Sequence, residues 1–301
     1  MDTLLNIRAF IAAAEAGSLA GAARRLCVSP SVITKRIARL EDEMRATLFI
    51  RTTRKLEITA IGAEYLPRYR GIVNEIDEAL RGARQSGGVL QGTLRIKSPT
   101  TITLLYLGRF FSDFQARHPN VNIDLVLMDR SANPNEEGFD IAIGAMPTSY
   151  ANVIDIPLCV NERVLCASPT YLSEREKILH PQDLIHHDCL VLPTIGNSWT
   201  FKGEAGDIEV TVRSRFSVND AQMLHDAACA GRGVTVVSEY IARRSIQEGR
   251  LTALLPDYPP KSLWLRAMVP RSRMDRSIVS AFIDDLKTYT SPIAPWDHPG
   301  M

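Results

Sequence analysis

The sequence predicts an α/β protein with an N-terminal winged helix-turn-helix, a long linker helix and a two-lobed body of doubly wound sheets. Two short amphipathic helices and a basic hairpin occupy residues 18–59, and apolar residues then recur at helical spacing up to residue 83. From residue 92 onward, strands alternate with helices. This alternation is typical of open, mostly parallel sheets with helices on both faces, and about 200 residues suit two such lobes.

The helix pair lies in residues 18–40, SLAGAARRLCVSPSVITKRIARL, after an amphipathic helix that ends at Gly17. Apolar residues of the first helix fall at i, i+3, i+4 and i+7, which places them on one face. Ser29 can cap the second helix, and Pro30 suits its first turn because the N–H that proline lacks has no helical partner there. The expected buried stripe of the second helix is Ile33, Ile37, Leu40 and Met44.

The outward face of the second helix is polar and basic near its N-terminus, as a helix that enters a major groove requires. Lys35 can donate to guanine or to phosphate, Ser31 and Thr34 are short hydrogen-bonding groups, and Pro30 can contact a thymine methyl group. An ordinary antiparallel helix pair with a solvated basic face has the same pattern. The two helices alone do not decide between these interpretations.

A basic hairpin after the second helix favours DNA binding. Residues 48–59, LFIRTTRKLEIT, predict two short strands around a basic turn, and such a wing meets the DNA backbone or the minor groove. Residues 1–60 contain ten Lys or Arg and six Asp or Glu, a net charge of +4, whereas the whole chain has +1. The candidate DNA-binding residues are Ser29, Pro30, Ser31, Thr34, Lys35, Arg39, Arg51, Thr52 and Arg54.

The linker is expected to be one long helix. Apolar residues recur every three or four positions from Ile61 to Ala83, and most other positions are charged. Such a helix most readily covers its apolar stripe with a copy of itself, although packing against its own body is the alternative. Gly87, Gly88 and Gly92 mark the end of the linker.

The body is expected to begin at Gly92 and to contain no internal repeat. Its Pro-rich tail after Ser291 is expected to be disordered. The expected strands are 93–97, 123–128, 140–143, 164–167, 189–192, 208–212, 215–218, 234–237 and 263–268, and the expected helices are 104–114, 220–230 and 276–289.

These motifs closely resemble the LysR-type transcriptional regulators. The carrying stretches are SLAGAARRLCVSPSVITKRIARLEDEM, LFIRTTRKLEITAIG, GTLRI, EEGFDIAI, CASPTYL and DLIHHDCL, in that order, so the resemblance covers nearly the whole chain. It implies a DNA-binding domain at 1–60, a linker and dimerisation helix with a hinge at 61–91, and an effector domain at 92–301. The effector domain would be a periplasmic-binding-protein-like sensor with lobe I at 92–161 and 265–291 and lobe II at 162–264, crossed near 160–162 and 262–265.

The resemblance also implies the partners. A cytoplasmic homodimer joined through the linker helix would read a pseudo-palindrome in double-stranded DNA, and two dimers would form a homotetramer. A small-molecule effector in the body would change how the dimers lie on DNA. No cofactor, metal or membrane partner is expected.

Effectors of open α/β sheets bind beyond the carboxyl ends of strands, where helix N-termini present N–H groups. Ser98, Thr100 and Thr101 follow a predicted strand, and Asn219 precedes the predicted helix 220–230. Trp199, Thr200 and Phe201 combine aromatic with polar groups, as small-molecule pockets do. Simple helix capping also explains Ser98 and Asn219. Gly144 stands where many relatives have an arginine, which argues against carboxylate recognition there and favours a larger or less charged effector. The candidate effector-binding residues are Ser98, Thr100, Thr101, Gly144, Trp199, Thr200, Phe201 and Asn219.

Several function classes are disfavoured. Five cysteines without CxxC spacing predict buried thiols in a reducing cytoplasm, with a redox-sensing thiol as the alternative. The sequence contains no run of 18 apolar residues, so it predicts no membrane-spanning helix. The motifs GxSxG, HExxH, Walker A and GxGxxG are absent, and the only dense cluster of catalytic residue types, residues 186–188, falls in a helix-to-strand loop. The rival interpretation is a small-molecule carrier or enzyme whose N-terminal helices serve only dimerisation.

Overall fold

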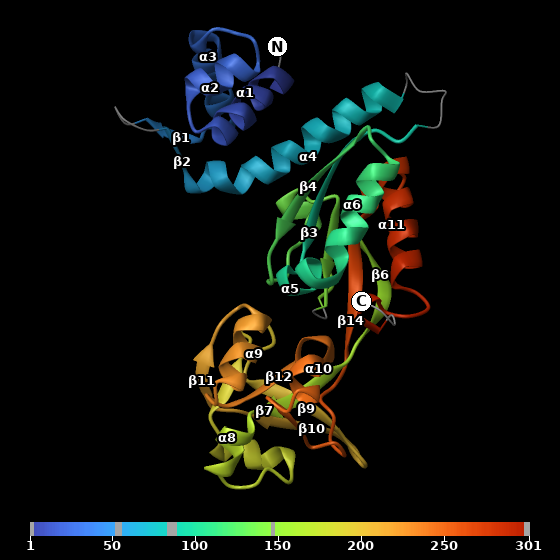
Figure 1. The fold of residues 1–301 in the computed structure, drawn as a ribbon. Coiled ribbons are helices and arrows are strands. Elements are labelled where there is room, and N and C mark those ends of the chain that lie inside the picture. Colours follow the sequence, from blue (N-terminus) through green and yellow to red (C-terminus); the bar gives the residue numbers. More distant parts are fainter. Residues whose placement is uncertain (1–2, 52–55, 83–88, 146–147, 298–301) are drawn as a thin grey trace. The chain divides into compact units, whose positions relative to one another are not determined.

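The computed structural model describes residues 3–51, 56–82, 89–145 and 148–297 (Figure 1). The chain divides into an N-terminal unit, Met1–Gly92 with Asn133–Phe139, and a C-terminal unit, Thr93–Ala132 with Asp140–Met301. Among the described residues, no helix has the length and apolar character needed to span a membrane.

The N-terminal unit is a winged helix-turn-helix followed by a long helix. Phe10 is fully buried at its centre, and its ring lies 5.4 Å from that of Phe49 and 6.1 Å from that of Tyr69. These contacts join the first helix, the hairpin and the long helix in one core. The elements are α1 (Thr3–Ala16), α2 (Leu19–Arg25), α3 (Pro30–Met44), β1 (Phe49–Arg51), β2 (Leu56–Ile58), α4 (Ala60–Gly82) and the short α7 (Pro134–Glu137).

Two local features fix the start of α4. Thr59 Oγ1 donates to Thr47 O at 2.7 Å and accepts from Gly62 N at 3.0 Å, so it ties the helix to the strand entry. A Cβ atom at Gly62 would lie only 2.5 Å from Leu48 O, so this close approach requires glycine. The expected end of this helix at Ala83 lies outside the described residues.

The first lobe of the C-terminal unit is a five-stranded sheet in the order β4-β3-β5-β14-β6. β3 and β5 are parallel, whereas β14 is antiparallel to both of its neighbours. The elements are β3 (Gly92–Ser98), α5 (Thr100–Ile102), the π-helical turn η1 (Thr103–Leu107), α6 (Gly108–Arg117), β4 (Val121–Leu127), β5 (Ile141–Gly144), β6 (Val153–Asn161), β14 (Leu263–Pro270), η3 (Arg271–Arg273), α11 (Ser277–Thr290) and η4 (Pro295–Asp297).

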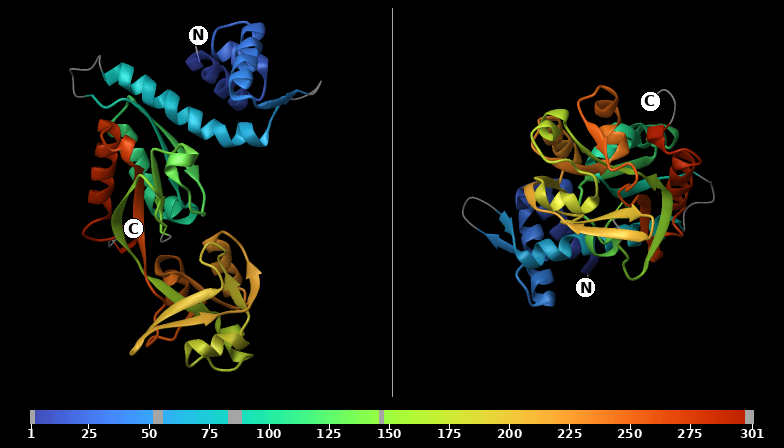
Figure 2. Two further views of the ribbon diagram at one scale, coloured as in Figure 1. Left: turned by 180° about the vertical axis from the view of Figure 1, so that it is seen from behind. Right: turned by 90° about the horizontal axis from the view of Figure 1, so that it is seen from below.

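Helices α6 and α11 lie side by side in this lobe (Figure 1, Figure 2). Phe114 and Phe282 are fully buried between them, with ring centroids 5.0 Å apart. Buried charge fastens the same lobe, because Asp140 accepts from Arg95 N at 2.7 Å and pairs with Arg273 and Arg276.

The second lobe is a five-stranded sheet in the order β11-β8-β12-β7-β13, with a separate hairpin formed by β9 and β10. The chain leaves the first sheet after Asn161 and returns at Leu263. The elements are β7 (Arg163–Ala167), α8 (Pro169–Ser173), η2 (Pro181–His186), β8 (Cys189–Val191), β9 (Ser198–Gly203), β10 (Gly206–Thr211), β11 (Ser214–Ser217), α9 (Ala221–Cys229), β12 (Val234–Ser238), α10 (Glu239–Gln247) and β13 (Thr252–Leu254).

The predicted fold class is confirmed, with two corrections. Both sheets are mixed rather than mostly parallel, since β14 and β7 run against their neighbours. The tail is not disordered up to Asp297: η4 forms a helical turn, and Trp296 is 7% exposed because it packs against two tyrosine rings.

Candidate DNA-binding surface and effector cavity

Helix α3 has one buried and one exposed face. Ile33, Ile37 and Leu40 are at most 1% exposed in the core of the N-terminal unit, as the periodicity predicts. On the other face, Thr34 is half-buried, and four further candidates on α3 are exposed: Pro30, Ser31, Lys35 and Arg39.

The start of α3 differs from the expectation in one detail. Ser29 occupies the N-cap position, but its side chain makes no capping hydrogen bond. Its Oγ lies 2.8 Å from Ser31 Oγ. The first turn of the helix is held by backbone hydrogen bonds, in which Ser29 O accepts from Val32 N and Ile33 N. Ser29 and Ser31 are both exposed, so the two hydroxyls stand beside the first turn of the exposed face.

The turn between α2 and α3 is held by small residues and one left-handed residue. Ala22 and Ala23 are at most 3% exposed, so α2 and α3 can pack closely. Cys27 has a φ of +52° and is exposed, because the turn directs it away from the core. The expectation of a buried thiol is therefore wrong at Cys27.

A carboxylate joins the recognition helix to the hairpin. Glu41 Oε1 accepts from Leu48 N at 2.7 Å and from Phe49 N at 3.2 Å. β1 and β2 then pair antiparallel, with Arg51 opposite Leu56. The side chain of Arg51 and all of Thr52 and Arg54 lie outside the described residues.

The C-terminal unit contains a cavity of about 100 Å³ between the two lobes. Its wall is largely apolar, and polar groups reach it from both sheets. Its polar and charged lining residues include Lys97, Thr101, Asp129, Asn161, Arg163 and Thr194.

Two polar atoms of this cavity are buried without a hydrogen-bond partner among the described residues. They are Asn161 Oδ1 and Thr194 Oγ1, and Asn161 is only 5% exposed. An unpaired buried acceptor costs about 1–3 kcal/mol, so a donor in the cavity would stabilise the protein.

Two cations of the cavity are well defined. Lys97 is 3% exposed, and its Nζ donates to Ile143 O at 3.1 Å. Arg163 donates through Nε to Lys261 O at 2.7 Å, and burial lowers the pKa of its guanidinium to about 10. The Arg163 guanidinium therefore still carries positive charge at neutral pH.

The residues predicted after the first strand are only partly at the cavity. Thr101 lines it, whereas Thr100 donates its backbone N–H to Asp129 Oδ1 at 3.0 Å. Ser98 is fully buried and lies 2.6 Å from Thr103 Oγ1. Gly144 does not line the cavity, but a Cβ atom placed on it would lie 3.7 Å from Lys97 Nζ.

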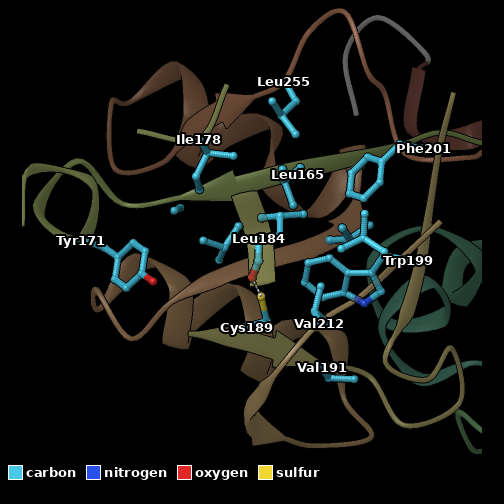
Figure 3. Packing of buried hydrophobic residues seen from close by; sticks show 14 residues of the cluster. Leu165, Tyr171, Ile178, Leu184, Cys189, Val191, Trp199, Phe201, Val212 and Leu255 are labelled. Atoms are coloured by element: carbon cyan, nitrogen blue, oxygen red, sulfur yellow. Dashed lines mark hydrogen bonds between the residues drawn. The ribbon is translucent and has the colours of Figure 1, made fainter. Parts of the chain in front are cut away.

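The aromatic residues of the predicted effector site lie in the core of the second lobe and not at the cavity. Trp199 and Phe201 are 5% and 0% exposed and belong to the core of the second lobe (Figure 3). Alternate residues of a strand point to the same face, so both point inward. Thr200 O accepts from Lys261 N, Asn219 is exposed, and neither lines the cavity. In the described structure, Thr101 lines the cavity and these four residues do not.

Sequence reasoning missed Lys97, Asn161 and Thr194. Lys97 and Asn161 lie at the carboxyl ends of β3 and β6, and Thr194 follows β8. The rule that ligands bind beyond strand ends could have found them. A lysine within a strand carries no such signal of its own, because its neighbours in the sequence do not show that it faces a cavity.

The histidine cluster has a structural role. His187 is 3% exposed, and its Nδ1 lies 3.3 Å from Tyr171 Oη, which accepts from Asp188 N at 3.0 Å. Burial lowers the pKa of His187. Among the residues that the structure describes, no group of three or more His, Cys, Asp or Glu is arranged to hold a metal ion.

The remaining cysteines are mostly buried. Burial raises the pKa of the thiols of Cys159, Cys166 and Cys189 to about 12, which disfavours the reactive thiolate. Cys229 is partly exposed, with its Sγ 3.6 Å from His225 Nε2.

A winged helix-turn-helix joined to a two-lobed α/β body with a cavity defines a class of protein, the DNA-binding regulator with a ligand-binding domain. Family models agree with this class. One described as "Bacterial regulatory helix-turn-helix protein, lysR family" matches residues 4–63, and one described as "LysR substrate binding domain" matches residues 87–291. The chain belongs to the LysR family and is a LysR-type transcriptional regulator.

Similar proteins extend over nearly the whole chain. The transcriptional regulator PtxR of Pseudomonas aeruginosa is 28% identical over 95% of this chain and 92% of its own length. DmlR of Escherichia coli K12 is 29% identical, over 88% of this chain and 87% of its own.

Solved structures show the same fold. Full-length AphB of Vibrio cholerae has a TM-score of 0.62 at 22% identity and covers 95% of this chain and 99% of its own. CrgA of Neisseria meningitidis has a TM-score of 0.58 at 24% identity and covers 95% and 98%.

Proposed function

We propose that this regulator acts as a homodimer that reads a pseudo-palindromic DNA site through α3 and the hairpin. A small molecule in the inter-lobe cavity controls that binding. The observation that carries the DNA contact is the exposed polar and basic face of α3, which begins at the helix N-terminus and is opposite the buried stripe. A recognition helix presents such a face to the major groove.

Lys35 and Arg39 are the principal cations of this face. Both are exposed, and within the described part of the chain neither forms an ion pair. Lys35 lies close to the helix start, where side chains reach base edges, and Arg39 lies one turn further along, where phosphates pass. Arg51, Thr52 and Arg54 remain proposed wing contacts.

The dimer is proposed to form through α4. Ile61 and Ile72 of this helix are 43% and 44% exposed, and apolar side chains of this size favour a partner surface. Two-fold symmetry would set two copies of α3 on successive major grooves, and two dimers would then form a tetramer on DNA. We place the protein in the cytoplasm, where its DNA is. The domain limits 1–60, 61–91 and 92–301 belong to the same proposal.

A carrier or an enzyme is the rival. The relatives are named transcriptional regulators, which supports a non-enzymatic role for this chain. Salt-dependent binding to one promoter sequence would exclude a module that serves dimerisation alone, because such a module has no reason to release counterions from DNA.

The test is the affinity of full-length Lys35→Ala for its footprinted site and for random DNA over a range of salt. If Lys35 contacts a base, specific binding weakens by about 1–3 kcal/mol. If it contacts phosphate only, all sequences weaken alike and the salt slope falls by about one. The control is Lys177→Ala, which removes an exposed lysine from the C-terminal unit. Unchanged affinity for both DNAs in Lys35→Ala would remove this helix face from the interface.

A further inference from the structure

We propose that the C-terminal unit has a second ligand site, on the reverse face of the segments that connect its lobes, which binds a small organic cation with an apolar body. The site is a cavity of about 460 Å³, here called the hinge pocket. Residues at the end of β6, at the start of β14, on α10 and in the segment 290–297 line it. Pockets that hold small molecules typically have volumes of about 300–1,000 Å³.

The hinge pocket is distinct from the inter-lobe cavity, and the connecting segments separate the two (Figure 1). Asn161, Arg163 and Leu263 line the inter-lobe cavity. Glu162 and Trp264, which are adjacent to these residues in the sequence, line the hinge pocket instead. Successive side chains of an extended chain point to opposite faces, so the same two segments present one set of side chains to each cavity.

The charge of the hinge pocket favours a cation. Its described wall contains one cationic group and three carboxylates, which are Arg243, Glu162, Glu239 and Asp297. Arg243 lies 2.6 Å from Asp297 Oδ1 and 3.5 Å from Glu239 Oε1, so these two carboxylates share one guanidinium. Glu162 accepts from the Ser262 hydroxyl, and within the described part of the chain it forms no ion pair. A cavity lined mainly by charge of one sign attracts the opposite charge.

An exposed aromatic ring provides a second, independent reason. Trp264 is 44% exposed, and it lines the same pocket as Glu162. Tryptophan attracts cations more strongly than the other aromatic side chains, when the cation lies over the face of its ring. A carboxylate and an indole ring are thus both available to one ammonium group. Leu158, Val160 and Ile293 also line the pocket and accommodate a hydrocarbon body.

The hinge pocket has walls from both lobes. β6, β14 and the C-terminal segment belong to the first lobe, whereas Glu239 and Arg243 come from α10 of the second lobe. A molecule that contacts both walls favours the lobe arrangement in which both contacts form. This inference goes beyond the proposed function, because it adds a second site to the one in the inter-lobe cavity.

The test measures, by calorimetry, the binding of two cations to the full-length protein. The cations are choline and 2-phenylethylamine, and their neutral analogues of similar shape are 3,3-dimethyl-1-butanol and 2-phenylethanol. We expect at least one cation to bind and its analogue to bind about tenfold more weakly or worse, because the analogue lacks both the attraction to the carboxylates and the attraction to the indole face. Added salt should weaken the binding of the cation more than that of the analogue.

Two variants separate the contributions of charge and ring. Glu162→Gln removes one charge and keeps the shape, and Trp264→Leu removes the aromatic face. Each should lower the affinity for the cation by about 3- to 10-fold and change that for the analogue less. The matched controls are Glu174→Gln and Phe216→Leu, which replace an exposed carboxylate and an exposed ring outside the pocket. Glu162 is itself exposed, so its variant is expected to fold whether or not Trp264→Leu does.

Two further measurements locate the bound cation. Thr194→Val alters the inter-lobe cavity and should leave the affinity for the cation unchanged. Binding should slow the exchange of backbone amides with solvent deuterium at residues 158–162 and 293–297, which belong to the hinge pocket.

The proposal is overturned if neither cation binds, if cation and analogue bind equally, or if Glu162→Gln binds the cation as the parent does. Slower exchange only at residues of the inter-lobe cavity would also overturn it. None of these results bears on DNA recognition by α3, which Lys35→Ala tests separately.

Discussion

At the scale of single residues, burial keeps the imidazole of His187 in its neutral form and gives it a structural role. It is 3% exposed at the end of η2, and within the described residues its Nε2 has no hydrogen-bond partner. Its Nδ1 faces the Tyr171 hydroxyl that also holds Asp188 N. A protonated imidazole would place a charge in this closed position, so the folded state favours the neutral ring.

The stability of the protein should therefore depend on pH through His187. Burial lowers the pKa of His187 in the folded state below the value of about 6.5 in an unfolded chain. Between these two pKa values only the unfolded chain binds the proton, so stability is complete above about pH 6.5 and decreases as the pH falls through the window. Denaturant unfolding at pH 7.5 and 5.5 should show a smaller difference for His187→Gln than for the parent. His186→Gln, at the exposed neighbouring position, is the control. Equal pH differences in all three proteins would contradict the assignment.

Residue roles could be predicted where they follow from local periodicity. Ile33 and Lys35 fall on opposite faces of one helix, so the buried and exposed sides of α3 followed from spacing alone. The aromatic pair at 199 and 201 could not be placed in this way. Its direction depends on which face of β9 meets the core of the lobe, and that is decided by strands far away in the sequence.

At the scale of elements, the hairpin is positioned by α3 through one side chain. Glu41 Oε1 accepts two backbone N–H groups at the entry to β1, at 2.7 and 3.2 Å. These bonds orient the hairpin with respect to the recognition helix, while Gly62 lets α4 approach from the other side.

Loss of the hydrogen bonds to Glu41 should lower the stability of the N-terminal unit. Glu41→Ala leaves the N–H groups of Leu48 and Phe49 without their acceptor, and hydrogen bonds to charged groups contribute about 1.5–3 kcal/mol. We expect the free energy of unfolding to fall by about this amount, and the two amides to exchange faster with solvent deuterium. Asp42→Ala, an exposed carboxylate on the same helix, is the matched control. Unchanged exchange at Leu48 and Phe49 would show that the bonds to Glu41 do not hold the hairpin.

Elements themselves were predicted unevenly, for a physical reason. Helices and the hairpin of the N-terminal unit depend on neighbours along the chain, and their expected positions agree with α1 to α3 and β1 to β2. The strands β9 and β13 and the helix α10 were not expected. The direction of β14 was also not expected, because it is set by the return of the chain from the second lobe and by no local signal.

At the scale of the whole C-terminal unit, the tail of the chain fastens α10 to the end of α11. Arg243 donates to Trp296 O at 2.8 Å and to Asp297 Oδ1 at 2.6 Å. The Trp296 ring lies 4.9 Å from that of Tyr240, which in turn lies 5.4 Å from that of Tyr106. Both polar and aromatic contacts thus connect the second lobe with the C-terminal turn η4.

The coupling between Arg243 and Asp297 can be measured by a double-mutant cycle. Because both side chains are more than a third exposed, solvent screens the pair, and we expect a coupling of about 0.5–1 kcal/mol between Arg243→Met and Asp297→Asn. Arg244 and Glu248, an exposed pair on and next to the same helix, provide the comparison and should show a smaller coupling. Additive effects of Arg243→Met and Asp297→Asn would mean that the contact does not fasten the lobes.

The pairing of β6 with β14 has a consequence for how such a sensor can change over evolutionary time. Asn161 and Leu263 are partners in that ladder, so the chain enters and leaves the second lobe at adjacent points. An insertion whose ends meet can be lengthened, replaced or recombined without displacing the host on either side of it. The second lobe therefore has the topology of an exchangeable cassette, while the first lobe retains Lys97 and both segments that flank the cassette. New ligand preferences can arise by recombination within one half of the cavity, and the DNA-reading module need not change.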